Sequence, residues 1–336
     1  MKTKIAINGF GRVGRIFFRY AFGRPDLDII AINDLGSSEN MAYLLKYDTV
    51  YGPYDKTVET DRDILIVDGK KIRMLQEKDP SKLPWEELNI DIVIESTGIF
   101  ESREKAASHL TAGAKRVVIT APAKDEVTPT ATPNVGEEFL KNDKITSNAS
   151  CTTNAATPVM SIMSENPGIK KAILNTIHAY TASQGLIDSP DKNDDFRRAR
   201  AGAQNIIPST TGAAIAATKA FPALKGKFDG ISLRVPVVCG SIMDFTFIAA
   251  RPTSVEEINS IFKKAATEKQ WQGILAVTEE PLVSSDIIRN PHGSIVDLAM
   301  TKVVDGDLVK ILSWYDNECG YASMLLNHVL AVSKLL

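Results

Sequence analysis

The 336-residue sequence has no long hydrophobic run, no cluster of cysteines and no excess of charge of one sign. A membrane helix needs about 20 consecutive apolar residues, and no stretch of this chain approaches that length. The first nine residues, MKTKIAING, contain only a short apolar stretch and therefore lack the hydrophobic region of a secretory signal peptide. These absences exclude a helical membrane protein and predict a cytoplasmic one.

The three cysteines are Cys151, Cys239 and Cys319. Their odd number and wide spacing argue against a disulfide framework, and against a zinc site, which typically uses close pairs such as C-x-x-C. The net charge is −2, and basic and acidic residues are interspersed along the chain. Nucleic acids and membrane surfaces bind to concentrated basic faces, so we expect neither of these partners, and we expect no metal.

The length of the chain suggests two domains. In the first half, short β-rich runs alternate with amphipathic stretches, as in a strand at 4–7, a helix at 11–22 and a strand at 28–32. This rhythm predicts a parallel sheet with right-handed crossover helices. The further elements expected there are a hairpin of 64–67 and 71–75, strands at 91–95, 115–120 and 145–148, and a helix at 102–110.

The pattern changes after residue 150. A helix at 152–165 and a strand at 171–178 precede a long polar loop, 179–208, and loops of that length are usually functional or lie at an interface. The later segments alternate as in an antiparallel sheet: a helix at 212–221, strands at 230–235, 242–250, 295–301 and 308–315, and a closing helix at 317–336. We therefore expect a first domain of residues 1–150, joined by helix 317–336, and an α+β domain of residues 151–316.

Residues 9–14 form the complete pattern G-x-G-x-x-G, with Gly9, Gly11 and Gly14 between an expected strand and an expected helix. In dinucleotide-binding domains of the Rossmann type, these glycines make the turn, admit the pyrophosphate and pack the helix on the strand. Asp34 follows at the end of the next strand, where a carboxylate accepts hydrogen bonds from a ribose diol and repels a 2′-phosphate. Asp34 therefore favours NAD over NADP. The strand before the glycines and the helix after them favour a cofactor site over a tight turn that binds no ligand.

Cys151 follows an expected strand and opens an expected helix, with Ser150, Thr152 and Thr153 beside it. The N–H groups and the dipole of a helix N-terminus stabilise a thiolate, so we expect a lowered pKa. His178 ends an apolar strand where the long loop starts, a common place for a catalytic base. Taken alone, these residues are also compatible with a small buried cysteine and a structural histidine. The remaining histidines are expected to be surface, packing or turn residues: His109, His292 and His328.

The segment 147–154, SNASCTTN, resembles the active-site segment of glyceraldehyde-3-phosphate dehydrogenases. The similarity extends along the chain through INGFGR at 7–12, KYD at 46–48, HAYT at 178–181, QNIIP at 204–208, TGAA at 211–214 and WYDNE at 314–318. This resemblance implies an NAD-dependent phosphorylating aldehyde dehydrogenase of glycolysis. In such an enzyme the Cys151 thiolate attacks glyceraldehyde 3-phosphate, His178 activates the thiol, hydride passes to NAD, and inorganic phosphate cleaves the resulting thioester to give 1,3-bisphosphoglycerate.

The resemblance also implies the residues that bind cofactor and substrate. Asn317 is expected to hold the nicotinamide carboxamide. Thr181 and Arg234, with Arg198, are expected to hold the phosphate of the substrate, because guanidinium groups suit that anion. The attacking phosphate is assigned to Ser150, Thr152, Thr211 and Gly212. The complete set expected to bind the cofactor is Gly9, Phe10, Gly11, Arg12, Val13, Gly14, Asp34, Ser96, Thr97, Gly98, Thr120, Asn317 and Tyr321.

The family resemblance further implies a homotetramer in which the long loop lines the cofactor site of a neighbouring subunit. The sequence departs from the family pattern at Ala155, where a second cysteine is common, at Ser189, which leaves some tolerance of NADP, and at 236–241 (PVVCGS), whose effect on substrate choice stays open. Two alternatives are retained. One is a related dehydrogenase of erythrose 4-phosphate, and the other is a non-catalytic NAD-binding redox sensor, since an exposed cysteine of low pKa suits sensing.

Overall fold

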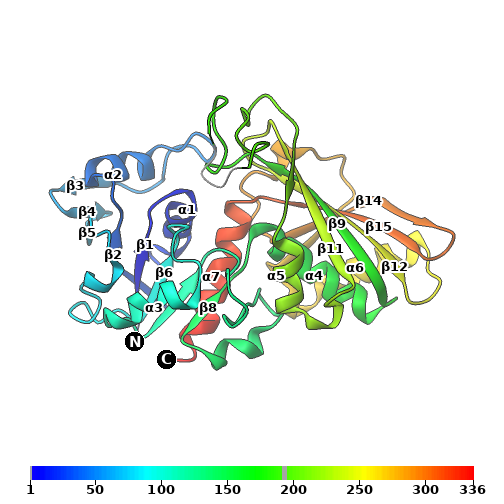
Figure 1. The fold of residues 1–336 in the computed structure, drawn as a ribbon, viewed down its shortest axis with the longest axis horizontal. Helices are drawn as coiled ribbons and strands as arrows, with labels where there is room; N and C mark the ends of the chain where they lie inside the picture. The colour runs from blue at the N-terminus through cyan, green and yellow to red at the C-terminus, as the bar shows by residue number, and fades with distance from the viewer. Residues whose placement is uncertain (1, 191–194) are drawn as a thin grey trace. The chain divides into compact units, whose positions relative to one another are not determined.

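The computed structural model describes residues 2–190 and 195–336. The chain divides into two compact units (Figure 1): unit 1 comprises Met1–Ala131, Gly136–Ala149 and Leu325–Leu336, and unit 2 comprises Thr132–Val135 and Ser150–Met324. The division differs from the expected one in two places. The short segment 132–135 groups with unit 2, and so does the closing helix as far as Met324, because that part of the helix packs into the core of unit 2.

Unit 1 is built on an eight-stranded sheet with the order β3-β4-β5-β2-β1-β6-β7-β8. All pairings from β5 to β8 are parallel, and β3, β4 and β5 pair in antiparallel fashion. The strands are β1 (Thr3–Asn8), β2 (Leu27–Asn33), β3 (Val58–Asp61), β4 (Ile64–Val67), β5 (Lys70–Leu75), β6 (Ile92–Glu95), β7 (Arg116–Ile119) and β8 (Ile145–Ser147). The helices are α1 (Arg12–Ala21), α2 (Ser38–Lys46), α3 (Arg103–Thr111) and the C-terminal part of α7 (Cys319–Ser333), with 3-10 turns at Pro80–Lys82 and Glu137–Asn142.

The central strands of unit 1 are buried on both faces. β6 and β7 are buried at every position, as expected for parallel strands covered on both sides by helices and loops. Helices α2 and α3 begin at serine caps, where the hydroxyls of Ser37 and Ser102 accept hydrogen bonds from backbone N–H groups three residues later. The Rossmann-type parallel sheet expected from the sequence is confirmed.

Unit 2 contains a seven-stranded sheet with the order β10-β11-β9-β12-β15-β14-β13. Most pairings are antiparallel, as expected, but β11 pairs with β9 and β13 with β14 in parallel. The strands are β9 (Ile169–Ala179), β10 (Ile207–Thr210), β11 (Phe228–Val235), β12 (Ser241–Ala249), β13 (Leu275–Thr278), β14 (Ser294–Val304) and β15 (Leu308–Tyr315). The helices are α4 (Cys151–Glu165), α5 (Ala213–Ala220) and α6 (Val255–Thr267), with 3-10 turns at Pro222–Leu224, Lys269–Trp271 and Ser284–Ile287.

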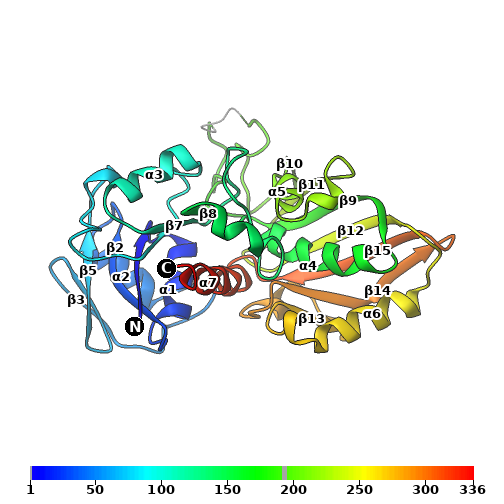
Figure 2. The same ribbon diagram turned by 90° about the horizontal axis from the view of Figure 1, so that it is seen from below.

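One face of the second sheet packs against helices, and the opposite, open face carries exposed side chains among the described residues. Buried and half-buried residues alternate along β12, and Met243, Phe245 and Phe247 contribute to a core that α4, α5 and α6 complete. Figure 2 shows α4 and α6 running alongside the strands of this sheet. The opposite face leaves Ile173 and Ile231 56% and 52% exposed.

The structure adds elements that the sequence did not suggest. Helices α2 and α6 and strands β3, β10 and β13 were not expected. Strand β9 runs to Ala179 and β10 starts at Ile207, so the loop expected at 179–208 is slightly shorter, and its residues 191–194 lie outside the described residues. The closing helix begins at Cys319 rather than at residue 317. No helix in the described part of the chain is long and apolar enough to cross a membrane.

Candidate active site

Cys151 is the first residue of α4. The hydroxyl of Ser150 caps the helix by accepting a hydrogen bond from the Thr153 N–H at 3.1 Å. The chain enters this cap through Ala149, which is fully buried and has a left-handed φ of 58°. An L-residue adopts that conformation only when its surroundings enforce it, so the position of the Cys151 thiol is set by a constrained turn.

His178 lies near the end of β9, directly opposite Arg234 of the parallel neighbour β11. Its Nε2 atom is 3.3 Å from Sγ of Cys151, so the residues expected to be nucleophile and base are in hydrogen-bonding contact. The imidazole is almost completely buried. A buried ring held against a thiol has the geometry that proton transfer between the two groups requires.

The other ring nitrogen determines which tautomer is present. Nδ1 of His178 lies 2.6 Å from the backbone oxygen of Ala179, and a carbonyl only accepts, so Nδ1 carries the proton. Nη1 of Arg234 can only donate, and it lies 2.8 Å from Nδ1 and 3.1 Å from the same oxygen. With the proton on Nδ1, the hydrogen bond of Arg234 is the one to the oxygen. Nε2 is then unprotonated and faces Sγ of Cys151 as a base.

The electrostatics of the pair differ from the sequence-based expectation. Burial raises the pKa of the Cys151 thiol, although the positive charge of Arg234 and hydrogen bonds from Thr152 act to lower it. The expectation that the helix N-terminus leaves a lowered pKa is therefore wrong for this state, because desolvation outweighs it. Burial, reinforced by Arg234, lowers the pKa of His178 to about 3. Both groups are therefore neutral at pH 7.

A buried hydroxyl network lies next to the nucleophile. The Tyr315 hydroxyl is 2.8 Å from Oγ1 of Thr152 and 2.7 Å from Oγ1 of Thr176, and burial raises the pKa of Tyr315 well above its usual value, so the hydroxyl stays protonated. The Tyr315 ring also contacts the edge of the His178 ring. The Thr152 side chain, expected to hold the attacking phosphate, contacts Tyr315 and also forms a hydrogen bond that acts on Cys151.

The residues expected to bind phosphate are placed differently from one another. Arg234 is half-buried, and burial lowers its pKa while the nearby Cys151 raises it. The positive charge of Arg198 also lowers the pKa of Arg234 and of His178, so both guanidinium groups lie close enough to His178 to influence it. Arg198 is oriented by Ser209, whose hydroxyl accepts from its Nε at 2.8 Å.

The remaining candidates for anion binding lie at chain turns. Thr181 is half-buried at the start of the long loop, and its hydroxyl pairs with that of Ser183 at 2.9 Å. The Thr211 hydroxyl accepts from the Ala213 N–H at 3.1 Å, just before α5, and Gly212 is the exposed N-cap residue of that helix. These residues present hydroxyl and backbone N–H groups, the donors that suit an anion.

The glycine loop of unit 1 has the geometry that a pyrophosphate needs. A Cβ atom on Gly9, whose φ is +93°, would lie 2.7 Å from the backbone of Ser96, and one on Gly14 would lie 2.2 Å from the oxygen of Gly9. A Cβ on Gly11 would meet nothing within 4 Å. The first and third glycines therefore permit close packing, whereas the second borders open space at the start of α1. This loop fits the phosphate groups of a dinucleotide.

Asp34 lies directly after β2 and is tied to the glycine loop. Its two carboxylate oxygens accept from the N–H groups of Phe10 at 2.7 Å and Gly36 at 2.9 Å, which fixes the carboxylate at the end of the strand.

Other cofactor candidates of unit 1 form contacts within that unit. The Ser96 hydroxyl donates to the oxygen of Gly9 at 2.6 Å, and the Thr120 hydroxyl donates to that of Glu95 at 3.0 Å. Arg12 forms an ion pair with the buried Asp48.

A buried polar network beneath this loop was not found by sequence reasoning. Glu95 is 2% exposed, and Oε2 accepts from the Asn8 amide at 2.6 Å and from Nε2 of His109 at 2.9 Å. The Trp85 indole donates to Nδ1 of His109 at 3.0 Å, so Nε2 carries the ring proton. Oε1 of Glu95 accepts from the Thr97 backbone. The network connects Asn8, next to the glycine loop, with Thr97. His109, expected to be a surface or packing residue, is fully buried.

Two further cofactor candidates belong to unit 2. Asn317 precedes α7, and its side-chain oxygen accepts from the Gly240 N–H at 3.2 Å and the Ser241 hydroxyl at 3.0 Å. Tyr321 is almost fully buried, and this burial raises the pKa of its hydroxyl well above the usual value. Cys239 and Cys319 are also buried.

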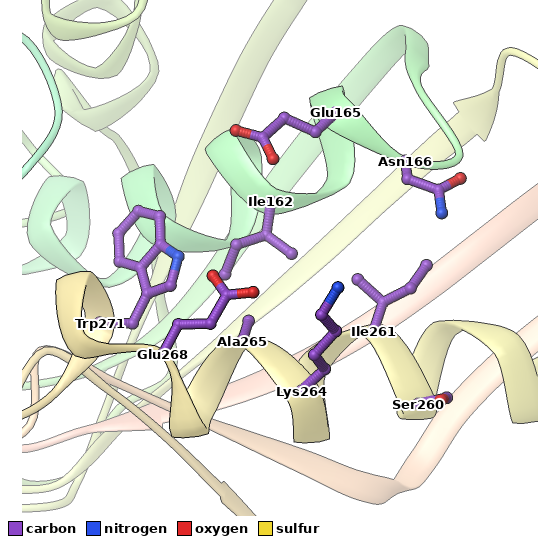
Figure 3. A pocket seen from close by; sticks show the side chains of 9 residues that line it. All are labelled: Ile162, Glu165, Asn166, Ser260, Ile261, Lys264, Ala265, Glu268 and Trp271. Atoms are coloured by element: carbon purple, nitrogen blue, oxygen red, sulfur yellow. The ribbon is translucent and has the colours of Figure 1, made fainter.

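A separate pocket of unit 2 lies between the C-terminal half of α4 and α6 (Figure 3). It contains none of the residues expected from the sequence to bind cofactor or substrate. Its lining residues are Ile162, Glu165, Asn166, Ser260, Ile261, Lys264, Ala265, Glu268 and Trp271.

Comparison with known families covers both units. Residues 3–103 match the model of the glyceraldehyde 3-phosphate dehydrogenase NAD binding domain, and residues 150–317 match that of the C-terminal domain. The chain belongs to the glyceraldehyde-3-phosphate dehydrogenase family. Cys151 and His178 both lie in the part of the chain that matches the C-terminal domain of this family.

Individual members of the glyceraldehyde-3-phosphate dehydrogenase family are similar to the chain over its full length. Glyceraldehyde-3-phosphate dehydrogenase of Zymomonas mobilis is 46% identical over 339 residues, and glyceraldehyde-3-phosphate dehydrogenase 2 of Streptomyces avermitilis is 48% identical over 338 residues; each alignment covers 100% of both chains. The enzyme of Geobacillus stearothermophilus is 46% identical, with 97% of each chain covered.

Proposed function

We propose that the protein is an NAD-dependent phosphorylating glyceraldehyde-3-phosphate dehydrogenase, which converts glyceraldehyde 3-phosphate and inorganic phosphate to 1,3-bisphosphoglycerate. The observation that carries this proposal is the 3.3 Å contact between Sγ of Cys151 and the unprotonated Nε2 of His178 in a chain of this family. The named relatives are all glyceraldehyde-3-phosphate dehydrogenases, which favours this substrate over erythrose 4-phosphate and an enzyme over a redox sensor.

His178 starts the reaction by removing the proton from the Cys151 thiol as sulfur attacks the aldehyde carbon. The guanidinium of Arg234, with that of Arg198, holds the phosphate of the substrate and offsets the charge that develops near the pair. NAD, when bound, supplies the acceptor for the hydride. Inorganic phosphate, held by Ser150, Thr152, Thr211 and Gly212, then cleaves the thioester, and His178 returns its proton to the sulfur of Cys151.

The cofactor is assigned to the glycine loop, because the space beside Gly11 is open and the N-terminus of α1, which favours an anion, begins there. Asp34 is placed to accept from the adenosine ribose, because Phe10 and Gly36 hold its carboxylate at the strand end. Its charge disfavours a 2′-phosphate. The same family assignment gives Thr97 and Gly98 backbone contacts to the cofactor.

We also propose a cytoplasmic homotetramer. The open face of the second sheet exposes Ile173, Ile231, Met300 and Val304, and the long loop exposes Phe196. Apolar side chains gathered on an uncovered sheet face are typical of subunit interfaces. Sedimentation velocity of the full chain tests this proposal, and a monomer at micromolar concentration would overturn it.

The activity is tested by following NADH absorbance with saturating NAD and glyceraldehyde 3-phosphate, with and without inorganic phosphate. The expected result is phosphate-dependent turnover that is lost in Cys151→Ser. Turnover that does not depend on phosphate would indicate a hydrolytic enzyme, and erythrose 4-phosphate would then be the next substrate to test. NAD binding without any turnover would support the redox sensor instead.

A further inference from the structure

The side-chain amide of Asn317 has a fixed orientation. Asn317 is 7% exposed, and its Oδ1 lies 3.2 Å from the Gly240 backbone nitrogen and 3.0 Å from the Ser241 hydroxyl. The backbone N–H is an obligate donor, so the atom that it contacts is the amide oxygen rather than the nitrogen. Nδ2 then has no hydrogen-bond partner within residues 2–190 and 195–336, and it is the group left to bind a ligand.

Ser241 supplies the second of these hydrogen bonds with its only proton. Its Oγ accepts from the Ala179 N–H at 3.1 Å, so the hydroxyl proton is free to point to Oδ1 of Asn317. Ser241 is 1% exposed, which removes competition from water. The oxygen of Ala179 accepts from Nδ1 of His178. The Ser241 hydroxyl thus joins Ala179, whose carbonyl group contacts the base, to the amide of Asn317.

Cys239 and Asp316, the residues next to Gly240 and Asn317, are also in contact. Sγ of Cys239, which is completely buried, lies 3.2 Å from Oδ1 of Asp316. The Asp316 carboxylate also accepts from the backbone N–H groups of Arg289 and Cys319 at 2.8 Å each. Cys239 therefore contacts Asp316, and Gly240 and Ser241 contact Asn317. The segment 236–241, in which the sequence departs from its family, has a direct structural relation to the cofactor candidate Asn317.

We propose that Ser241 is a positioning residue that directs Nδ2 of Asn317 toward the carboxamide oxygen of the nicotinamide. Without the hydroxyl, Oδ1 keeps only the Gly240 N–H as a donor, so the orientation of the amide is held less firmly. This inference rests on the proposed binding of NAD. It does not depend on which aldehyde is oxidised.

The test compares NAD with ADP-ribose, which lacks the nicotinamide, by isothermal titration calorimetry on the full chain. Ser241→Ala is expected to raise the Kd for NAD about three- to tenfold, the factor for one lost hydrogen bond, and to leave the Kd for ADP-ribose unchanged. Equal weakening of both ligands would show a structural role only, and no change for NAD would also overturn the proposal.

A matched control is available on β14. Ser294 is fully buried, and its hydroxyl pairs with that of Ser313 at 2.7 Å. Ser294→Ala removes a buried hydroxyl from the same sheet and is expected to leave both Kd values unchanged. Ser241→Cys keeps a weaker donor of similar size and is expected to fall between the wild type and Ser241→Ala, which keeps the proposal testable if the alanine variant does not fold.

A double-mutant cycle shows whether Ser241 acts through Asn317. Asn317→Ala is expected to raise the Kd for NAD by itself, and adding Ser241→Ala in that background is expected to raise it no further. Full additivity of the two effects would overturn the proposal. If the wild type binds NAD without oxidising glyceraldehyde 3-phosphate, the proposed substrate fails while the role of Ser241 is still decided by these titrations. If the wild type does not bind NAD, both fail.

Discussion

Sγ of Cys151 lies 3.3 Å from Nε2 of His178, although the two residues come from the start of a helix and the end of a strand. The thiol is neutral because burial raises its pKa, and the imidazole is neutral because burial lowers its pKa to about 3. The thiol must therefore lose its proton before or during the attack, and His178 is the base in contact with it.

Replacing His178 should accordingly slow every reaction of the Cys151 thiol. His178→Asn is expected to lower kcat by roughly 10² to 10⁴, the usual contribution of a general base, and to slow alkylation of Cys151 by iodoacetamide at pH 7. Stopped-flow NADH formation and mass-spectrometric alkylation rates measure the two effects. His292→Asn is the control, since His292 is a half-buried turn residue bonded to Asn290. An unchanged alkylation rate in His178→Asn would refute the assignment.

Arg234 affects both the chemistry and the binding of substrate. Its charge lowers the pKa of Cys151 and of His178. In Arg234→Gln the pKa of Cys151 should rise further, because the nearby cation is lost, so the pH profile of alkylation moves to higher pH. The KM for glyceraldehyde 3-phosphate should increase about 10- to 100-fold, as expected for a lost hydrogen bond to a charged group.

The control for Arg234→Gln is Arg200→Gln. Arg200 is an exposed residue of the long loop that pairs with Asp188 at 2.7 Å, and its replacement is expected to leave the alkylation profile in place. An alkylation profile of Arg234→Gln that coincides with that of the wild type would mean that the guanidinium does not act on the thiol.

Two substitutions in the glycine loop should affect stability differently. A Cβ on Gly11 meets nothing within 4 Å, whereas one on Gly14 lies 2.2 Å from the oxygen of Gly9. Gly14→Ala should destabilise the protein by about 1–3 kcal/mol, as overpacking does. Gly11→Ala should keep the wild-type Tm and still weaken NAD binding more than tenfold, because its methyl group occupies the space assigned to the pyrophosphate. Thermal unfolding and NAD titration separate the two cases, and full NAD affinity in Gly11→Ala would contradict the proposed site.

Local patterns were enough to predict the glycine loop, the helix that starts at Cys151 and the strand that carries His178, because each depends on neighbours in the sequence. Helix α6 also has a local signal that was overlooked: Ser254 and Glu257 form the S-x-x-E start pattern, and the Ser254 hydroxyl accepts from the Glu257 N–H. Strand β3 has only four residues and is mostly exposed, so its hydrophobic pattern carries little information.

Contacts between distant residues were beyond the reach of these patterns. Asn8, Glu95 and His109 meet from three separate elements, and each one alone reads as an ordinary polar residue. The pKa of Cys151 was misjudged for the same reason: the helix N-terminus is visible in the sequence, whereas the burial that outweighs it depends on the whole fold.

His328 should make the protein sensitive to mild acid. It is fully buried in α7, with Nε2 3.0 Å from the Thr146 hydroxyl and Nδ1 3.4 Å from the Asn148 amide. Burial lowers its pKa to about 4, whereas an unfolded chain has a value of about 6.5. Between these values the unfolded state binds more protons than the folded state, so the free energy of unfolding falls as the pH decreases from about 6.5 to about 4.

The expected loss over that pH range is roughly 3 kcal/mol from His328 alone. His328→Gln keeps hydrogen-bonding groups next to Thr146 and Asn148 but does not titrate, so its unfolding free energy should depend less steeply on pH, even if its value at pH 7 is lower. Urea unfolding at a series of pH values measures this slope. His178 contributes its own acid sensitivity to both proteins and cancels in the difference. Equal slopes for the variant and the wild type would show that His328 does not stay neutral in the folded state.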